Sequence, residues 1–345
     1  MNRKLYFIRA NRNKFGGAEN YLSRLSIALN KQNINYQVVN SVFPRFLPSW
    51  LRAILFNFQV SFLKKDKFYF SLDRITCPDI YRAGDGVHKY YLGIEKKSQI
   101  NLLHPVYLFL EKRCFNNSKC IIANSSMVRN QIIKVYGIDQ KKVKVVHNGI
   151  KTKEINYEES FKKLSKEFAI TKDQPIILFV GSGFKRKGVA EFLQIVSKIK
   201  IDDIKVFVIG KEKNIKFFIN LSRKLNIEKQ VVFTGPREDV DDFYTISDIF
   251  LFPTHYDPFS NTVLEAMNFG NAVFTTKQNG ASEILDENYI MDNPEDYIVA
   301  SNINNLLSDQ VKLNNIKQKN RLKSLEFSIE KNLSETLDII NEVIN

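Results

Sequence analysis

The segment GSGFKRKG at residues 181–188 combines glycines and positive charges in a pattern that could bind an anion. It follows the apolar run PIILFV, typical of a strand, and precedes VAEFLQIVSKI, typical of a helix. A glycine loop at such a junction directs backbone N–H groups and the positive end of the helix dipole toward a ligand, which suits phosphate. Lys185, Arg186 and Lys187 add three cations. We therefore predict an anion site here, with a basic surface turn as the alternative.

This segment completes neither of the two phosphate-binding motifs that it partly matches. The dinucleotide fingerprint requires a glycine at position 186, where this chain has Arg186. A P-loop requires Lys and then Ser or Thr after Gly188, where this chain has Val189 and Ala190. The missing fingerprint argues against an NAD-dependent oxidoreductase.

A pair of carboxylates lies in FPTHYDPFSNTVLEAMNFG, residues 252–270. Asp257 falls in a predicted loop after a strand, and Glu265 falls one to two turns into the following predicted helix, so both could face one cleft. At the start of that helix, the backbone N–H groups of Phe259, Ser260 and Asn261 could donate hydrogen bonds to an anion or to a hydroxyl. Carboxylates beside phosphate donors suit a ligand that combines phosphates with many hydroxyls, namely a nucleotide sugar.

Two other patterns have a weaker connection to chemistry. Gly16 and Gly17, directly after the first predicted strand, would let a backbone approach a ligand closely, although a glycine pair is more often only a turn. Asp239 and Asp241 form a D-x-D that could hold a metal, but they begin a predicted helix, where Asp caps the helix and complements its dipole. The four histidines are dispersed, so we expect no metal site.

The elements that must position these residues alternate between strands and helices, which predicts parallel sheets covered by helices. The chain has two series of predicted strands, at 4–10, 35–41, 67–72, 79–85 and 120–125, and at 175–182, 204–211, 230–235, 248–254 and 271–276. We predict two doubly wound α/β domains, 1–150 and 151–324, with ligands at the carboxyl ends of the strands. Residues 320–344 are predicted as one long amphipathic helix, which either caps the second domain or, from about 325 to 345, packs back on the first.

Positive charge is concentrated in the first half of the 345-residue chain. The net charge is +14, and residues 1–150 carry 25 Lys and Arg against 8 Asp and Glu, whereas the rest carries 26 against 29. This asymmetry indicates an anionic partner, which could be a membrane surface, a phosphorylated glycan or nucleic acid, with a solvated lysine-rich surface as the alternative. The chain has no recognisable nucleic-acid module, which argues against a nucleic-acid-binding protein.

Two apolar stretches in the basic half could contact a membrane surface. Residues 48–65, PSWLRAILFNFQVSFLKK, place Trp50, Leu51, Ile54, Leu55, Phe58 and Phe62 on one helical stripe flanked by Arg45, Arg52, Lys64 and Lys65. The stretch is too short to span a bilayer, so it is either a core helix or an interfacial helix, and 104–115 presents the same alternatives. Three scattered cysteines without a signal peptide predict a reducing compartment, the cytoplasm.

Several segments, taken in order over about residues 1 to 290, resemble family 4 of the retaining glycosyltransferases. They are FGGAENYLSRLSIAL, IIANSSMVRNQIIKVYG with KVKVVHNGI, FVGSGFKRKGVAEFLQIVSKI and VVFTGPREDVDDFYTISDIFLFPTHYDPFSNTVLEAMNFG. Within the family, DIYRAGDGVHKYY and GSGFKRKGV resemble the lipopolysaccharide core glucosyltransferases. The resemblance implies the GT-B fold, two Rossmann-like domains facing a cleft, with an acceptor-side domain at 1–150 and a nucleotide-sugar domain at 151–324.

The resemblance also implies roles for residues of the second domain. The family's E-x7-E pair corresponds to Asp257, expected at the donor sugar's hydroxyls, and Glu265, expected at the ribose. Lys187 corresponds to a lysine expected on the diphosphate. Many members have an arginine after Gly181, where this chain has Ser182, and Arg186 is a candidate substitute. The segment VVFTGPRED resembles the part that meets the nucleotide base, near Gly235 and Arg237.

In the first domain, the resemblance implies that Gly16 and Gly17 approach the diphosphate and that either Asp85 or His88 lies near the reacting carbon. The implied activity is transfer of a hexose from a nucleotide sugar, UDP-linked by preference, to an envelope glycan or lipid-linked acceptor. The family retains anomeric configuration by a front-face mechanism without metal or other cofactor. A phosphorylase or epimerase of the same fold is the alternative. We expect such an enzyme at the inner face of the cell membrane.

Overall fold

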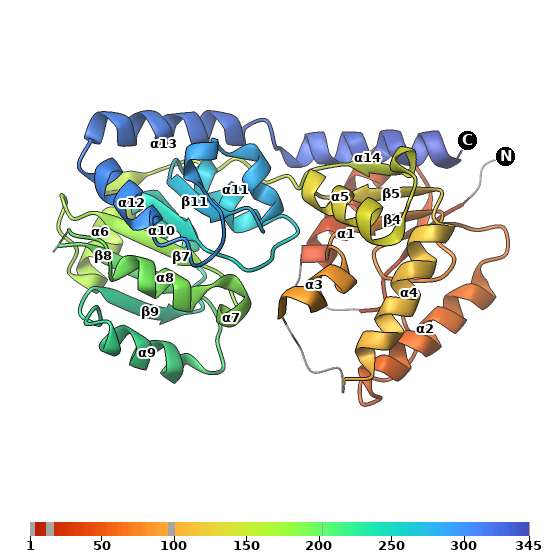
Figure 1. The fold of residues 1–345 in the computed structure, drawn as a ribbon. Helices are drawn as coiled ribbons and strands as arrows, with labels where there is room; N and C mark the ends of the chain where they lie inside the picture. Colours follow the sequence, from red (N-terminus) through yellow and green to blue (C-terminus); the bar gives the residue numbers. More distant parts are fainter. Residues whose placement is uncertain (1–3, 12–16, 96–100, 202, 345) are drawn as a thin grey trace. The chain divides into compact units, whose positions relative to one another are not determined.

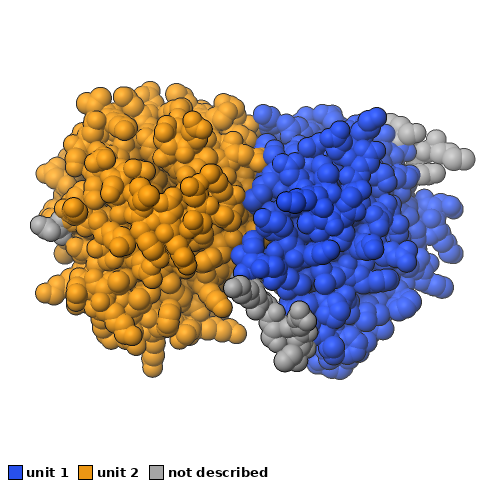
Figure 2. Space-filling model, in the orientation of Figure 1, with its two compact units in different colours: residues 1–149, 329–345 blue, residues 150–328 orange. Residues whose placement is uncertain are grey.

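The computed structural model describes residues 4–11, 17–95, 101–201 and 203–344. The chain forms two compact units: unit 1 comprises residues 1–149 and 329–345, and unit 2 comprises residues 150–328 (Figures 1 and 2). Gly16 lies outside the described residues, and Gly17 begins the first helix.

Unit 1 is built on a six-stranded parallel sheet with the order β2-β1-β3-β4-β5-β6. Its strands are β1 (Leu5–Ile8), β2 (Tyr36–Val39), β3 (Phe68–Ser71), β4 (Ile80–Ala83), β5 (Cys120–Ala123) and β6 (Val143–Val145). Its helices are α1 (Gly17–Lys31), α2 (Ser49–Leu63), α3 (His88–Glu95), α4 (Leu103–Asn117), α5 (Ser126–Tyr136) and α14 (Ile329–Ile344). Strand order reverses beside β1, because β2 lies on one side of β1 and β3 on the other.

Unit 2 repeats this plan, with the strand order β12-β11-β10-β7-β8-β9. Its strands are β7 (Ile176–Val180), β8 (Lys205–Ile209), β9 (Val231–Gly235), β10 (Ile249–Phe252), β11 (Ala272–Thr276) and β12 (Ile290–Met291). Its helices are α6 (Tyr157–Phe168), α7 (Phe184–Lys187), α8 (Val189–Val196), α9 (Ile215–Lys224), α10 (Val240–Ile246), α11 (Asn261–Asn268), α12 (Val299–Leu307) and α13 (Gln310–Ser324). Here the order reverses between β7 and β10, and such a switch point is where doubly wound sheets bind ligands.

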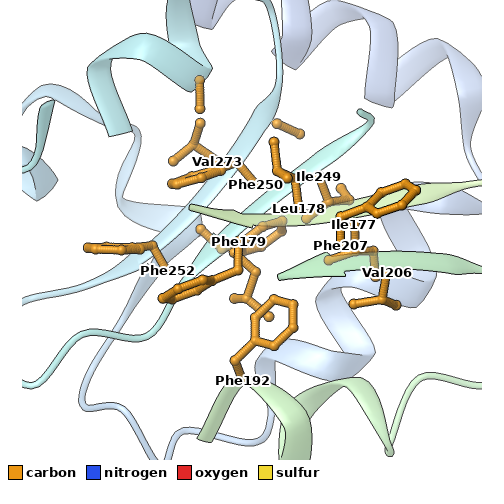
Figure 3. Close-up of a cluster of buried hydrophobic side chains, with 14 of the residues drawn as sticks. Ile177, Leu178, Phe179, Phe192, Val206, Phe207, Ile249, Phe250, Phe252 and Val273 are labelled. Atoms are coloured by element: carbon orange, nitrogen blue, oxygen red, sulfur yellow. The ribbon is translucent and has the colours of Figure 1, made fainter. Parts of the chain in front are cut away.

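The core of unit 2 explains why its strands appear in the sequence as unbroken apolar runs. Helices cover both faces of the sheet, so successive side chains are buried along β10, β11 and most of β7 and β8, whereas the edge strand β9 is only partly buried. Phe179 of β7 packs edge-on against Phe192 of α8 at 5.5 Å between ring centroids, and it stacks on Phe252 of β10 at 5.4 Å (Figure 3). The predicted fold is confirmed: every predicted strand is present, and β6 and β12 are added.

The C-terminal segment differs from the single helix predicted over 320–344. It forms two helices, α13 and α14, because the chain at Phe327 and Ser328 pairs with the backbone of Ile150, which residues within a helix cannot do. Ile150 N–H donates to the Phe327 carbonyl at 3.0 Å. After this break α14 belongs to unit 1, where the buried hydroxyls of Tyr21 and Thr336 lie 3.0 Å apart.

This arrangement places the whole net charge of the chain in unit 1. Unit 1 has 26 Lys and Arg against 12 Asp and Glu, even though α14 is acidic, and unit 2 has 25 of each. The predicted charge asymmetry therefore follows the boundary between the two units.

Candidate active site

Lys187 and Asp257 form a buried ion pair at the switch point of unit 2. Lys187 ends α7, after β7, and Asp257 lies in the loop after β10. The Lys187 Nζ contacts the Asp257 carboxylate and lies 4.9 Å from the centroid of the Phe252 ring. The Arg186 Nη1 lies 4.0 Å from the same carboxylate and donates to the Tyr256 carbonyl at 2.7 Å. The structure thus brings three predicted site residues together, two cations and one carboxylate.

The surroundings of Lys187 shift the pKa of its amine. Burial lowers its pKa below the ordinary lysine value, and Arg186 lowers it further, whereas the Asp257 carboxylate acts in the opposite direction. An anionic ligand at this position would give the lysine a second negative partner.

The absence of a side chain at Gly188 allows the loop after β7 to contact the loop after β10. The single turn of α7 lies between Gly183 and Gly188, whose φ angles are +75° and +76°. A Cβ atom at Gly188 would lie 1.8 Å from the carbonyl oxygen of Pro253 in the other loop. The two loops are also joined by His255 N–H, which donates to the Arg186 carbonyl at 3.0 Å. The residue type at 188 therefore controls how closely Lys187 approaches Asp257.

Gly181 and Gly210 bring the ends of β7 and β8 equally close. A Cβ atom at Gly210 would lie 1.9 Å from the Gly181 carbonyl oxygen, and Gly210 N–H donates to the Gly235 carbonyl at 3.0 Å. Ser182 Oγ accepts from Lys211 N–H at 3.0 Å. Gly210 was not among the predicted site residues, although its position directly after an apolar strand was the available signal.

Two of the three backbone N–H groups predicted to bind a ligand at the start of α11 donate hydrogen bonds to acceptors within the protein. Phe259 N–H donates to Asp257 Oδ1 at 3.2 Å, and Ser260 N–H donates to Asn279 Oδ1 at 3.2 Å. Asn261, the first residue of α11, is exposed. Asn279, which follows β11, is fully buried and was not predicted as a site residue. The Asn279-Gly280 pair, a typical turn sequence, was the feature that could have indicated it.

Glu265 and Arg237 both have partners within unit 2. The half-buried Glu265 side chain lies one turn into α11, and its Oε2 accepts from the Tyr244 hydroxyl at 3.3 Å. The Arg237 guanidinium is held by Asp239 at 2.8 Å and by Glu167 at 2.7 Å. Gly235, at the end of β9, has a φ of +72° that favours glycine. The base-contacting roles predicted for Gly235 and Arg237 remain predictions.

The carboxylates of the D-x-D segment are engaged by cations. Asp239 binds Arg237 and Lys163, which hold the pKa of its carboxyl well below the usual range, and Asp241 binds Lys153. Asp239 is the N-cap residue of α10, but its side chain makes no capping hydrogen bond, so the predicted cap is wrong in this detail. Asp241 lies in the first turn, where its charge complements the helix dipole.

Asp85 and His88 lie in unit 1, after β4. Asp85 is largely exposed, with Arg74 Nη1 at 3.9 Å from its carboxylate. His88 begins α3, and its Nε2 lies 3.2 Å from Nδ1 of His104.

Glu111 of α4 is a residue that the sequence analysis missed. Its carboxylate is fully buried and accepts from Arg74 Nε at 2.9 Å, from the Tyr136 hydroxyl at 2.6 Å and from the backbone N–H of His88 at 2.7 Å. A buried carboxylate needs such partners to offset its lost hydration. Glu111 thereby positions both Arg74 beside Asp85 and the start of α3. The signal was one acid inside the apolar run HPVYLFLEKRCF.

Two family models match the chain. The model described as "Glycosyl transferases group 1" matches residues 160–323, and the model described as "Glycosyltransferase Family 4" matches residues 86–154. The chain carries glycosyltransferase domains of group 1 and family 4. The predicted relationship to the glycosyltransferases, an enzyme family, is confirmed.

Curated relatives are similar to parts of this chain. N-acetyl-alpha-D-glucosaminyl L-malate synthase of Bacillus anthracis is 26% identical over 209 residues, 59% of this chain and 55% of the relative. The lipopolysaccharide glucosyltransferase WaaG of Escherichia coli is 32% identical over 123 residues, 34% of this chain and 33% of WaaG. The matches therefore span about half or less of these relatives' lengths.

Solved structures confirm the GT-B fold over nearly the whole chain. The crystal structure of WaaG matches with a TM-score of 0.80 and 18% identity, covering 97% of this chain and 99% of WaaG. The structure of HepE from Anabaena, in complex with UDP and glucose, matches with a TM-score of 0.73 and 18% identity, covering 99% of this chain and all of HepE.

The close approach at Gly188 can be tested with a matched pair of substitutions. Gly188→Ala and Gly183→Ala introduce the same methyl group at nearly the same positive φ, but a Cβ at Gly183 meets nothing within 4 Å. Both variants should lose about 1 kcal/mol of unfolding free energy from backbone strain. Gly188→Ala should lose at least about 2 kcal/mol more, because the loop must move away from Pro253. Denaturant unfolding measures this, and equal losses in the two variants would contradict the described contact.

Proposed function

We propose that the protein is a retaining hexosyltransferase that moves a sugar from a nucleotide sugar, UDP-linked by preference, to an envelope glycan or lipid-linked acceptor. The observation that carries this proposal is the cluster of Arg186, Lys187 and Asp257 at the switch point of a group 1 glycosyltransferase domain. The UDP and UDP-glucose complexes of HepE support a UDP-linked donor. The names of WaaG and of the capsular polysaccharide glycosyltransferase CapM of Staphylococcus aureus support an envelope glycan.

In the proposed reaction, the bond between the sugar's anomeric carbon and the diphosphate oxygen breaks, and a bond from that carbon to the acceptor oxygen forms on the same face. The acceptor's hydroxyl proton passes to the leaving diphosphate. Negative charge grows on the diphosphate as the bond breaks, and Lys187 and Arg186 are placed to stabilise it. No metal is assigned a role in this scheme.

The other site residues position the reactants. Asp257 would exchange its contact with Lys187 for hydroxyls of the donor sugar, and Glu265 would bind the ribose. Asp85 or His88 would position the sugar or the acceptor near the reacting carbon, with Arg74 and Glu111 holding that segment in place. The diphosphate would thereby replace Asp257 as the main anion facing Lys187.

A donor-binding assay tests the proposal directly. A screen of UDP, GDP and ADP sugars by thermal shift should find at least one that raises the melting temperature of the wild type. Lys187→Ala and Glu265→Ala should each weaken its binding about tenfold or more, because each removes a charge-assisted hydrogen bond. Lys216→Ala is the control, since Lys216 is an exposed cation on α9 of the same unit and lies outside the predicted anion loop. Absence of any stabilising donor, or equal binding by the four proteins, would overturn the assignment.

The lowered pKa of Lys187 predicts a specific pH dependence of donor affinity. Only the protonated amine attracts a diphosphate, and this amine loses its proton below the ordinary lysine pKa of about 10.4. Affinity for UDP should therefore fall as pH rises through the alkaline range below the ordinary lysine value of about 10.4. Lys187→Arg should bind UDP with a flatter profile over this range, because a guanidinium stays charged. Calorimetric titrations at a series of pH values measure this, and parallel profiles would contradict the role of Lys187.

We further propose that unit 1 binds an anionic membrane surface through α2 and α4, which lie side by side (Figure 1). Helix α2 is buried through Phe56 and Val60, whereas Phe58 and Phe62 of the predicted stripe are 67% and 83% exposed. On α4, Phe109 is 58% exposed beside the exposed cations Lys112 and Arg113. Exposed aromatics among cations on a basic unit suit an anionic lipid surface. None of the helices in the described ranges has both the length and the apolar character needed to cross a membrane.

Lys64 and Arg52 do not belong to this membrane surface. Lys64 forms an ion pair with Asp79 and lies 4.4 Å from the Tyr69 ring centroid, and Arg52 lines a cavity on the other side of α2. The two exposed phenylalanines of α2 therefore offer the sharper test.

Replacing both Phe58 and Phe62 by Ser should weaken binding to phosphatidylglycerol vesicles about tenfold or more, because two exposed aromatic anchors are lost. Phe217→Ser, at a 52% exposed position on α9 of unit 2, should bind these vesicles like the wild type. Sedimentation with vesicles of phosphatidylglycerol or phosphatidylcholine measures both. Unchanged binding by the double variant would remove α2 from the proposed surface.

A further inference from the structure

Unit 1 contains a cavity of about 490 Å³ at the switch point of its sheet. Residues that follow four neighbouring strands line it: Ala10 after β1, Ser41 after β2, Asp73 after β3 and Asp85 after β4. Its opposite wall consists of the segment 42–45 and the first turns of α2, with Tyr107 of α4. The cavity therefore shares Asp85 with the candidate residues near the reacting carbon.

The arginines on the sheet side of the cavity are paired with carboxylates within the protein. The Asp73 carboxylate binds Arg9 Nη1 at 3.0 Å and also accepts from the backbone N–H of Ala10 at 2.6 Å. Arg74 is paired with the buried Glu111 at 2.9 Å and faces Asp85 at 3.9 Å. Arg9 also binds Glu19 at 2.7 Å, so each arginine on this side has two carboxylate neighbours and neither is available as an unpaired cation.

Arg52, on the α2 side, has no such carboxylate partner among the described residues. Its side chain is partly buried, and its buried Nε finds no hydrogen-bond acceptor in that part of the chain. Arg45 lines the same wall. Burying a guanidinium N–H without an acceptor costs free energy, so this group favours a ligand that supplies one. Phosphate and carboxylate oxygens match the fork of guanidinium donors best.

The start of α2 adds a second, independent preference for an anion. Ser49, Arg52 and Ala53 all line the cavity, so the first turn of this 15-residue helix faces it. The N-cap residue is Pro48, which makes no side-chain capping hydrogen bond, and the first turn contains no acidic residue. The positive end of the helix dipole at the cavity is therefore not offset by a carboxylate of the helix's own first turn.

We propose that this cavity binds an anionic substituent, a phosphate or a carboxylate, carried by the acceptor, with Arg52 as its main partner and Arg45 and the start of α2 in support. The inference rests on the proposed function, since it names the class of acceptor: a phosphorylated or uronic-acid-containing sugar rather than a neutral one. A substituent held at Arg52 would place the rest of the acceptor toward Asp85, which lines the same cavity.

The test measures binding of small sugar probes to the full chain by calorimetry or NMR. Glucose 6-phosphate or glucuronate should bind in the millimolar range with an affinity that falls as salt is raised, and glucose should not bind. Whichever probe binds identifies the substituent. Arg52→Gln should weaken that binding about tenfold or more, and Arg52→Lys should retain part of it. Arg24→Gln is the control, because Arg24 is an exposed arginine on α1 of the same unit and belongs neither to this cavity nor to the proposed membrane surface.

Three results would overturn the proposal: no binding of either anionic probe, equal binding of glucose, or anion binding that survives Arg52→Gln in a protein whose melting curve matches the wild type. Survival would locate the anion at another site, such as the Lys187 loop. UDP-sugar binding by the wild type is measured in parallel. Binding of a UDP-sugar without an anion site at Arg52 refutes this inference alone, whereas an Arg52-dependent anion site without donor binding refutes the proposed function.

Discussion

The contact between the loops that follow β7 and β10 is the constraint on which the candidate active site depends. Lys187 and Asp257 are 70 residues apart in the chain, and they meet because β10 returns to pair with β7 in the middle of the sheet. Only a glycine at 188 lets the two backbones come close enough. The buried ion pair then holds the loops together, since removing one partner of such a pair typically costs about 3–5 kcal/mol.

The same topological rule operates in unit 1 with different chemistry. Strand order reverses beside β1, and the strand ends there surround a cavity lined by Asp73 and Arg74, each of which is ion-paired, and by Arg52, which forms no ion pair among the described residues. The wall nearest Asp85 is organised by Glu111, which holds Arg74 and the start of α3 from a separate helix. Doubly wound sheets thus provide equivalent positions for ligands, and side chains decide which ligand each position favours.

The two compact units also differ in net charge. Unit 2 has equal numbers of acidic and basic residues, so its cations at Arg186 and Lys187 act through local geometry rather than through a general field. Unit 1 carries the entire net charge of +14 and exposes aromatic side chains on α2 and α4. Such a distribution suits a protein with a phosphorylated donor in one unit and an anionic partner at the other.

The sequence by itself determined all the strands except β6 and β12, together with the α/β class, the family and the residues of the main cluster. These follow from local information: apolar runs mark buried parallel strands, and glycines with cations directly after a strand mark an anion loop. The tertiary structure alone decided which charges neutralise each other. The Arg237 guanidinium forms an ion pair with Glu167, and the Asp239 carboxylate forms ion pairs instead of capping α10. The buried Glu111 carboxylate accepts a hydrogen bond from the backbone of His88. Helix α14 is separate from α13 and belongs to unit 1. Each of these outcomes depends on which distant segments the strand order brings together, and a pattern of neighbouring residue types does not contain that information.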